Sequence, residues 1–185
     1  MDFSNLYNEY LSKVDLLGLD YTDHVLIANI TTQRLAYFHK ARTLKVYLMS
    51  SSKKQQSCIE NSLGTPWGLH VVCEKIGTGQ PQGMVFEGRV PIGLKADQCS
   101  VEKQKKNLIT TRILRLSGLE QKVNKGGNVD SFKRYIYIHG TNHEQNLGTP
   151  VSSGCLQLSN ESIQDVFDMI EVGTQLYIER PSKLV

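Results

Sequence analysis

The segment that most constrains this chain is YIYIHGTNHEQNLGTPVSSGC, residues 135–155. Tyrosine and isoleucine favour strands, so its first four residues predict a strand that runs into His139. A polar loop follows and ends at Cys155, which stands between Gly154 and a second apolar run. A strand that leads into an imidazole, followed by a loop that leads into a thiol, indicates a β-sheet protein that carries chemistry rather than packing alone at this point.

The rest of the chain predicts more strands and two helices. Apolar residues at helical spacing predict a helix over residues 3–17. A second helix is predicted over residues 159–173, with Ser159 or Asn160 as its cap and Gly173 at its end. Turn signals and β-favouring runs predict strands at 24–30, 34–39, 43–50, 68–76, 83–90, 108–119, 134–140 and 173–180. The polar segments 51–64 and 102–107 predict loops, and the expected architecture is a single mainly-β domain.

Composition excludes several classes of partner. A chain of 185 residues with 21% charged and 39% hydrophobic residues is an ordinary globular domain. Its net charge of +3 is too small to predict a nucleic-acid partner, and no segment has the roughly 20 apolar residues of a membrane span. Asp2 and Glu9 stand where a secretory signal needs basic and then apolar residues. A cytoplasmic location is therefore expected, or a periplasmic one if the natural N-terminus is longer.

Of the four cysteines, only Cys155 has a neighbourhood that asks for explanation. No C-x-x-C motif occurs, which excludes a zinc knuckle or a thioredoxin-type site. Cys73 lies in a predicted strand, where a small buried apolar residue is the usual role. Cys58 and Cys99 lie in polar stretches, and no role is expected for them.

A thiol needs a base to act as a nucleophile, because its unperturbed pKa is about 8.5. His139 could supply that base, since the sixteen-residue connection to Cys155 is long and flexible enough to bring the two together. Gly154 would leave the backbone N–H groups beside the thiol free to bind an oxyanion. Alternatively, His139 only caps the sheet and Cys155 packs as a small apolar residue, which residue types alone favour.

A metal site is not expected. His139 and His143 are four residues apart, which is a zinc-ligand spacing on a helix, but they span a strand and a loop, where such residues do not share a face. Two histidines and one cysteine are also an incomplete ligand set.

Taken together, these motifs resemble the catalytic domain of the L,D-transpeptidases, the YkuD-type fold. The family pattern is a strand ending in His-Gly-Thr, a loop, Ser-X-Gly-Cys, a helix, and Gly-Thr at the start of the last strand. This chain matches it with YIYIHGTN, LGTPVSSGC and GTQLYI. The upstream segments SLGTPWGLHVVCEKIGTGQPQGMVFEGR and LITTRILRLSGLE resemble the family as well, so the likeness covers nearly the whole chain after the first helix.

The resemblance implies a mixed, sandwich-like or barrel-like β-sheet, with a lead-in helix over residues 1–20, one catalytic domain over residues 21–185, and a helix after the cysteine. It implies an enzyme without cofactor or metal that acts on a peptidoglycan tetrapeptide or muropeptide and releases the terminal D-Ala through a thioester. Cys155 would be the nucleophile, His139 its base, and Gly140 would orient the ring through its carbonyl.

Further roles follow from the same resemblance. Gly154 would supply an oxyanion-hole amide beside that of Cys155, with Ser152 and Ser153 in support. Thr141 and Gln157 would contact the substrate.

Two positions depart from the family pattern. Ser153 stands where His, Lys or Arg is common, and Gln157 stands where Arg or Asn is common. An arginine could hold a substrate carboxylate as a fork, whereas glutamine brings no charge. Carboxylate binding is therefore expected to pass to Arg112 or Arg134, although a structural role is the better expectation for Arg134.

The motif leaves the acceptor of the acyl group open. Water would make the protein an L,D-carboxypeptidase of murein recycling, which the expected cytoplasmic location favours. An amine would make it a transpeptidase that forms cross-links. The departure at Gln157 keeps a third alternative, an inactive peptidoglycan-binding module.

Overall fold

The computed structural model describes residues 3–181, and its strands form one mixed sheet. The strands are β1 (His24–Asn29), β2 (Arg34–His39), β3 (Arg42–Ser50), β4 (Gly68–Ile76), β5 (Met84–Glu87), β6 (Val90–Lys95), β7 (Ile109–Gly118), β8 (Tyr137–Thr141), β9 (Leu156–Leu158) and β10 (Gln175–Ile178). The α-helices are α1 (Ser4–Leu17), α2 (Val101–Gln104) and α3 (Asn160–Met169). Within the described residues, no helix has the length and apolarity needed to span a membrane.

The sheet closes on itself. Its strand order is β4-β10-β1-β2-β3-β9-β8-β7-β5-β6, and β4 also pairs with β7, so eight strands form a ring from which the β5–β6 hairpin extends. The pairs β1–β10 and β8–β9 are parallel, whereas the other pairs of named strands are antiparallel. The expected mixed, barrel-like β fold is confirmed.

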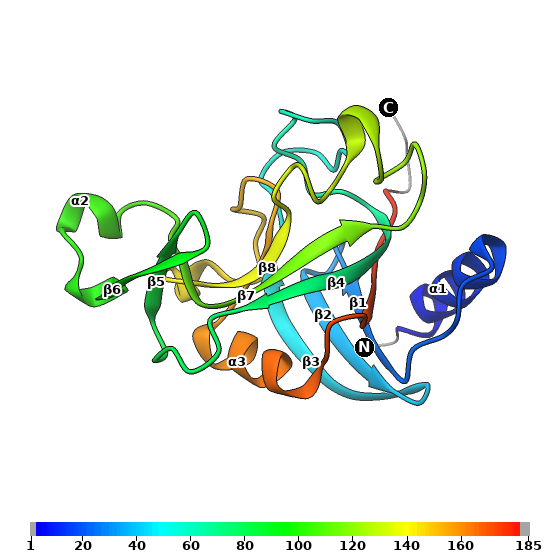
Figure 1. Cartoon of the computed structure of the whole chain (residues 1–185), viewed down its shortest axis with the longest axis horizontal. Coiled ribbons are helices and arrows are strands. Elements are labelled where there is room, and N and C mark those ends of the chain that lie inside the picture. The colour runs from blue at the N-terminus through cyan, green and yellow to red at the C-terminus, as the bar shows by residue number, and fades with distance from the viewer. Residues whose placement is uncertain (1–2, 182–185) are drawn as a thin grey trace.

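Helices cover two separate apolar surfaces of this sheet (Figure 1). α3 packs on β7 and β8 and buries Ile163, Val166 and Phe167 in the main core cluster. α1 packs on β1 and β4 and buries Leu6 and Val14 in a second cluster. Figure 1 places α1 at one end of the molecule and the β5–β6 hairpin with α2 at the opposite end. Both predicted helices are present, but α3 ends at Met169, so the predicted end at Gly173 is wrong.

The predicted strand over 83–90 is wrong, because the chain turns within it. β5 ends at Glu87 and β6 begins at Val90, and these two residues pair across a two-residue turn. Gly88 and Arg89 have φ of 52° and 72°, the left-handed backbone that a tight hairpin needs. A single glycine inside an otherwise strand-like run gave little sign of this turn.

Three smaller expectations also change. The basic run 102–107 is not all loop: α2 includes its first three residues, and the hydroxyl of Ser100 caps this helix by accepting the Lys103 N–H. Cys58 and Cys99 are buried although their sequence neighbours are polar. β8 covers Tyr137–Thr141 rather than the predicted 134–140, because residues 134 and 135 lie in a turn and pairing with β7 extends the strand to Thr141.

Candidate functional site

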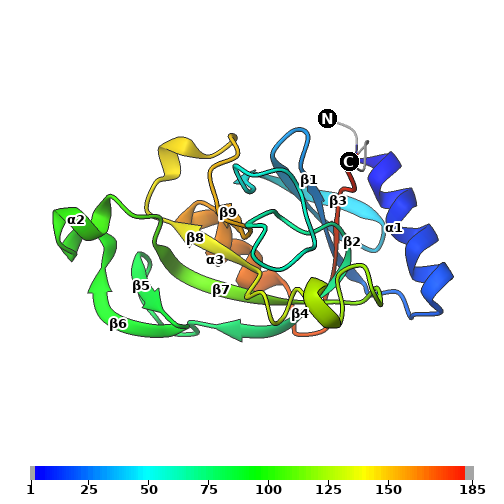
Figure 2. The same ribbon diagram turned by 90° about the horizontal axis from the view of Figure 1, so that it is seen from above.

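β8 and β9 lie side by side (Figure 2), and their parallel pairing brings His139 near the residue that precedes β9, Cys155. In this register His139 lies opposite Gln157, and Ile138 lies opposite Leu156. Cys155 immediately precedes β9, so it stands level with Tyr137, two residues from His139. Because side chains alternate along strands, the cysteine and the histidine lie on one face while Ile138 and Leu156 point into the main core.

The His139 ring is oriented by the next residue. Its Nδ1 lies 2.8 Å from the Gly140 carbonyl oxygen, which can only accept, so Nδ1 carries the proton and Nε2 is left as the basic nitrogen. The ring is 4% exposed, and burial lowers the pKa of His139 to about 4. The imidazole is therefore neutral at neutral pH and can accept a proton. The Gly140 contact is the one that the sequence predicts.

Glycine is needed at position 140 by close packing. A Cβ there would stand 2.7 Å from the Thr110 carbonyl oxygen and 2.9 Å from the Asn160 side-chain oxygen. A side chain would therefore push β8 away from β7 and from the start of α3, and it would move the carbonyl that orients the ring.

Cys155 is a half-buried thiol in an apolar setting. It packs against the cluster formed by Met84, Phe86, Ile113 and Tyr137. Burial raises the pKa of Cys155 to about 11, and the Tyr137 backbone N–H and the Arg134 charge offset this only in part. The resting site is thus a neutral thiol beside a neutral imidazole.

The thiol does not contact the imidazole in this state. The Cys155 Sγ is 3.5 Å from the Tyr135 carbonyl oxygen, to which it donates, and no hydrogen bond among the described residues joins it to His139. Catalytic hydrogen bonds are often formed only when substrate is bound, so a rotation of the thiol toward Nε2 would complete the pair.

A tight turn presents the thiol. The Ser152 hydroxyl donates to the Cys155 carbonyl at 2.6 Å and accepts the Gly154 N–H at 3.2 Å. The Gly154 amide is therefore already engaged, contrary to the expectation that it is free to bind an oxyanion. Gly154 has φ of 127°, which favours glycine, and Ser153 is exposed on the outside of the turn.

Both predicted substrate-binding residues, Thr141 and Gln157, are buried. Gln157 is on the same face as His139 and opposite it in the sheet. Thr141 is fully buried, and its hydroxyl accepts the His143 N–H, so it is held within the protein.

Neither predicted arginine is free. The Arg112 guanidinium donates to the carbonyls of Gln80 and Thr111 and lies 5.5 Å from the Phe167 ring of α3, on the side of the sheet opposite to Cys155. Arg134 donates to the carbonyls of Ser57 and Gly64, as a structural arginine would. Arg134 is nevertheless the cation that acts on the Cys155 thiol.

Arg89, in the β5–β6 turn, is a cation that contacts two tyrosines next to the thiol, and the sequence did not indicate it. It donates to the Tyr137 hydroxyl at 3.1 Å, and its guanidinium lies 5.2 Å from the centre of the Tyr135 ring. Both tyrosines border Cys155, and Tyr135 is 55% exposed. No carboxylate of the described residues forms an ion pair with Arg89. The left-handed backbone of this arginine is unfavourable for a residue with a side chain, and such strain is common at functional positions.

The fold and the site together define a closed β-sheet domain in which a cysteine and a histidine lie on one face of two neighbouring parallel strands. The chain belongs to the L,D-transpeptidase catalytic domain family, YkuD, whose family model matches residues 23–178.

Individual relatives agree with this assignment. The protein named "Putative L,D-transpeptidase YqjB" of Bacillus subtilis (strain 168) is 28% identical over 109 residues, which are 56% of this chain and 56% of that protein. ErfK/SrfK of Salmonella typhimurium, a probable L,D-transpeptidase, is 45% identical over 51 residues, which are 27% of this chain and 16% of that protein. The chain thus spans less than two thirds of either relative.

A solved structure is similar in fold. L,D-transpeptidase 3 from Mycobacterium tuberculosis, solved with a faropenem-derived adduct, gives a TM-score of 0.54 at 14% identity, over 85% of this chain and 60% of that chain.

Proposed function

We propose that this protein is a cysteine acyl-transfer enzyme that removes the terminal D-Ala from peptidoglycan stem tetrapeptides, with water as the acceptor. The observation that carries this proposal is the placement of His139 and Cys155 on one face of two parallel strands, with Nδ1 held by the Gly140 carbonyl. Because Nδ1 carries the proton, Nε2 is the ring nitrogen that can accept a proton from the Cys155 thiol.

The proposed reaction has two steps. In the first, His139 Nε2 takes the Cys155 proton while Sγ attacks the carbonyl carbon that precedes D-Ala. The C–N bond breaks, the imidazolium gives its proton to the leaving amine, and a thioester remains on Cys155. In the second step, His139 takes a proton from water, the resulting oxygen attacks the thioester, and Sγ leaves and is reprotonated. The products are a tripeptide and free D-Ala.

The state of the cysteines supports a reducing, cytoplasmic setting for this chemistry. Cys58, Cys73, Cys99 and Cys155 are all free thiols. Cytoplasmic thiols are kept reduced, whereas secreted domains more often pair their cysteines in disulfides. A recycled, soluble muropeptide is then the proposed substrate.

The reaction products show whether water or an amine accepts the acyl group. We expect incubation with disaccharide tetrapeptide to give disaccharide tripeptide and D-Ala, both alone and with an excess of a second tetrapeptide that offers a free amine. Mass spectrometry of the two mixtures distinguishes the acceptors. Cross-linked dimers as the main product in the second mixture would contradict the carboxypeptidase and establish transpeptidation.

Arg89 is proposed to bind a substrate carboxylate in place of the arginine that Gln157 replaces. Its guanidinium has no carboxylate partner among the described residues and is held by two tyrosines that border the thiol. A hydrogen bond to a charged group contributes about 1.5–3 kcal/mol. Arg89→Ala is therefore expected to lower kcat/KM by about 10- to 100-fold, mainly through KM.

The substrate itself supplies the control for this prediction. Tetrapeptides amidated at the D-Ala carboxylate, or at the side-chain carboxylate of the third residue, remove one candidate partner at a time. The Arg89→Ala penalty should disappear for one of them. An unchanged penalty for both amidated substrates would show that Arg89 acts only through packing. Arg112→Ala should give no such substrate-dependent effect.

A further inference from the structure

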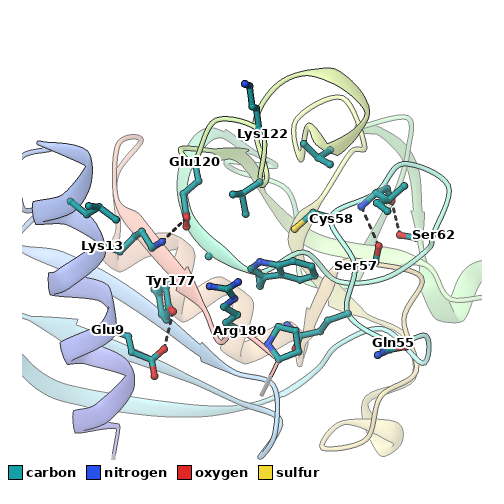
Figure 3. Close-up of a pocket in the computed structure, with 18 of the residues that line it drawn as sticks. Glu9, Lys13, Gln55, Ser57, Cys58, Ser62, Glu120, Lys122, Tyr177 and Arg180 are labelled. Atoms are coloured by element: carbon teal, nitrogen blue, oxygen red, sulfur yellow. Dashed lines mark hydrogen bonds and ion pairs between the residues drawn. The ribbon is translucent and has the colours of Figure 1, made fainter. Parts of the chain in front are cut away.

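A large open cavity lies apart from Cys155, between α1 and two loops (Figure 3). Its volume is about 1390 Å³. One wall is α1, the opposite wall is formed by the loops around residues 54–62 and 120–129, and the chain after β10 contributes Arg180. Such a volume exceeds that of most small-molecule sites and can accept an extended ligand.

The wall formed by α1 is mainly polar because one stripe of the helix carries polar side chains. Asn5, Asn8, Ser12 and other cavity residues follow one another three or four positions apart, so they form a single stripe. The opposite stripe of α1 carries the residues that are buried against the sheet. Because α1 precedes the segment matched by the family model, this wall is added to the catalytic domain by this chain.

The cavity combines an aromatic face with neutral amides and with charged groups, of which Lys54, Lys122 and Arg180 form no ion pair among the described residues. Trp67 is partly exposed and lines the cavity, and its indole N–H has no acceptor among the described residues. The charged side chains of α1 that line the cavity have partners: Lys13 forms an ion pair with Glu120 at 2.8 Å, and Glu9 accepts a hydrogen bond from the Tyr177 hydroxyl at 2.8 Å (Figure 3).

This chemistry fits a saccharide. An indole is amphipathic, with a flat apolar face for the C–H side of a sugar ring and an N–H that can donate to a hydroxyl. Amide side chains such as those of Asn8 and Gln55 both donate and accept, as sugar hydroxyl and acetamido groups require.

One loop separates the cavity from the thiol. Ser57 and Ser62 line the cavity, and the Arg134 guanidinium on the other side of this loop donates to the Ser57 carbonyl and acts on Cys155. A Cβ at Gly154, beside the thiol, would stand 3.5 Å from the carbonyl oxygen of Gly64 in the same loop. A ligand in the cavity can therefore reach the thiol by crossing a single segment of chain.

We propose that this cavity binds the glycan part of a muropeptide, stacked on Trp67, while its stem peptide crosses the 57–64 loop to Cys155. The link to the stem peptide rests on the proposed function, whereas saccharide binding in the cavity does not.

Trp67 is the only tryptophan of the chain, so its fluorescence reports on the cavity. Full-length Cys155→Ala protein, which cannot turn over substrate, is titrated with an N-acetylglucosamine tetramer, with disaccharide tetrapeptide and with free tetrapeptide. We expect the two sugar-containing probes to change the fluorescence with saturation and free tetrapeptide to leave it unchanged. No change with either sugar-containing probe would overturn the proposal. An equal response to free tetrapeptide would assign the cavity to a peptide instead.

Matched variants test the lining without removing the reporter. Asn8→Ala and Gln55→Ala each remove a neutral hydrogen-bonding group from the cavity and should each weaken saccharide binding about fivefold. Gln145→Ala, an exposed amide outside the cavity, should leave it unchanged. Equal affinities in all three variants would contradict the assigned lining.

Kinetics separate this proposal from the proposed reaction. In the enzyme that retains Cys155, Trp67→Ala should raise KM for disaccharide tetrapeptide about tenfold or more while leaving KM for free tetrapeptide and both kcat values unchanged. If no tetrapeptide is cleaved at all, the proposed reaction fails, but the fluorescence titration still decides whether the cavity binds saccharide.

Discussion

Cys155→Ala is expected to reduce D-Ala release by about 10⁴-fold or more and to leave the fold intact. The change removes only the sulfur, which no other group of the site replaces. The structural cost is small for two reasons. Cys155 is only half-buried, and the Ser152 hydroxyl bonds to the backbone carbonyl of residue 155, which alanine retains. The measurement is release of D-Ala from tetrapeptide, with circular dichroism to confirm that the variant is folded.

Intact-mass spectrometry adds a direct reading of the same prediction. The enzyme should carry the mass of the acyl group after brief exposure to substrate, and Cys155→Ala should not. Cys73→Ala is the matched control, because Cys73 is the other half-buried thiol, and its variant should keep both the adduct and the activity. Normal turnover in Cys155→Ala would refute the proposed reaction.

His139→Ala is expected to slow acylation by about 10²-fold or more, the usual contribution of a general base. The reason is the resting charge state: burial keeps the imidazole neutral and raises the pKa of the thiol to about 11, so little thiolate exists at neutral pH without a base. Single-turnover acylation rates measure this effect. His143→Ala is the control, because His143 lies in the loop after β8 and should matter far less.

The pH dependence distinguishes a base from a residue that only supports the strand. In the unmodified enzyme, acylation should be nearly constant around neutral pH and should fall as pH falls through about 4, where His139 becomes protonated and can no longer accept a proton. In His139→Ala the thiol must ionise alone, so the rate should climb with pH toward about 11. Parallel pH profiles for the two proteins would mean that the ring has only a structural role.

Much of the fold and the identity of the candidate pair could be predicted from the sequence, because the patterns concerned are local. The run YIYIHG has β-favouring residues in a row, and helix caps and turn residues marked most element ends. The motifs around His139 and Cys155 have a spacing that belongs to one family, whereas the parallel pairing of β8 with β9 was seen only in the structure. The orienting role of the Gly140 carbonyl was likewise predictable, because that carbonyl is covalently next to the ring.

Only the tertiary structure decided which cations reach the site and what surrounds it. Arg112 and Arg89 are both arginines of strand-like segments, but a register shift in β7 accompanies the contact of Arg112 with α3, while a tight turn in the β5–β6 hairpin brings Arg89 to the hydroxyl of Tyr137. The Gly154 amide is engaged by a hydroxyl two residues away, and the large cavity needs α1 to lie across from the distant loops around residues 54–62 and 120–129. These features depend on sheet register, hairpin geometry and the packing of distant segments, and the free energies that select them come from contacts that no local pattern contains.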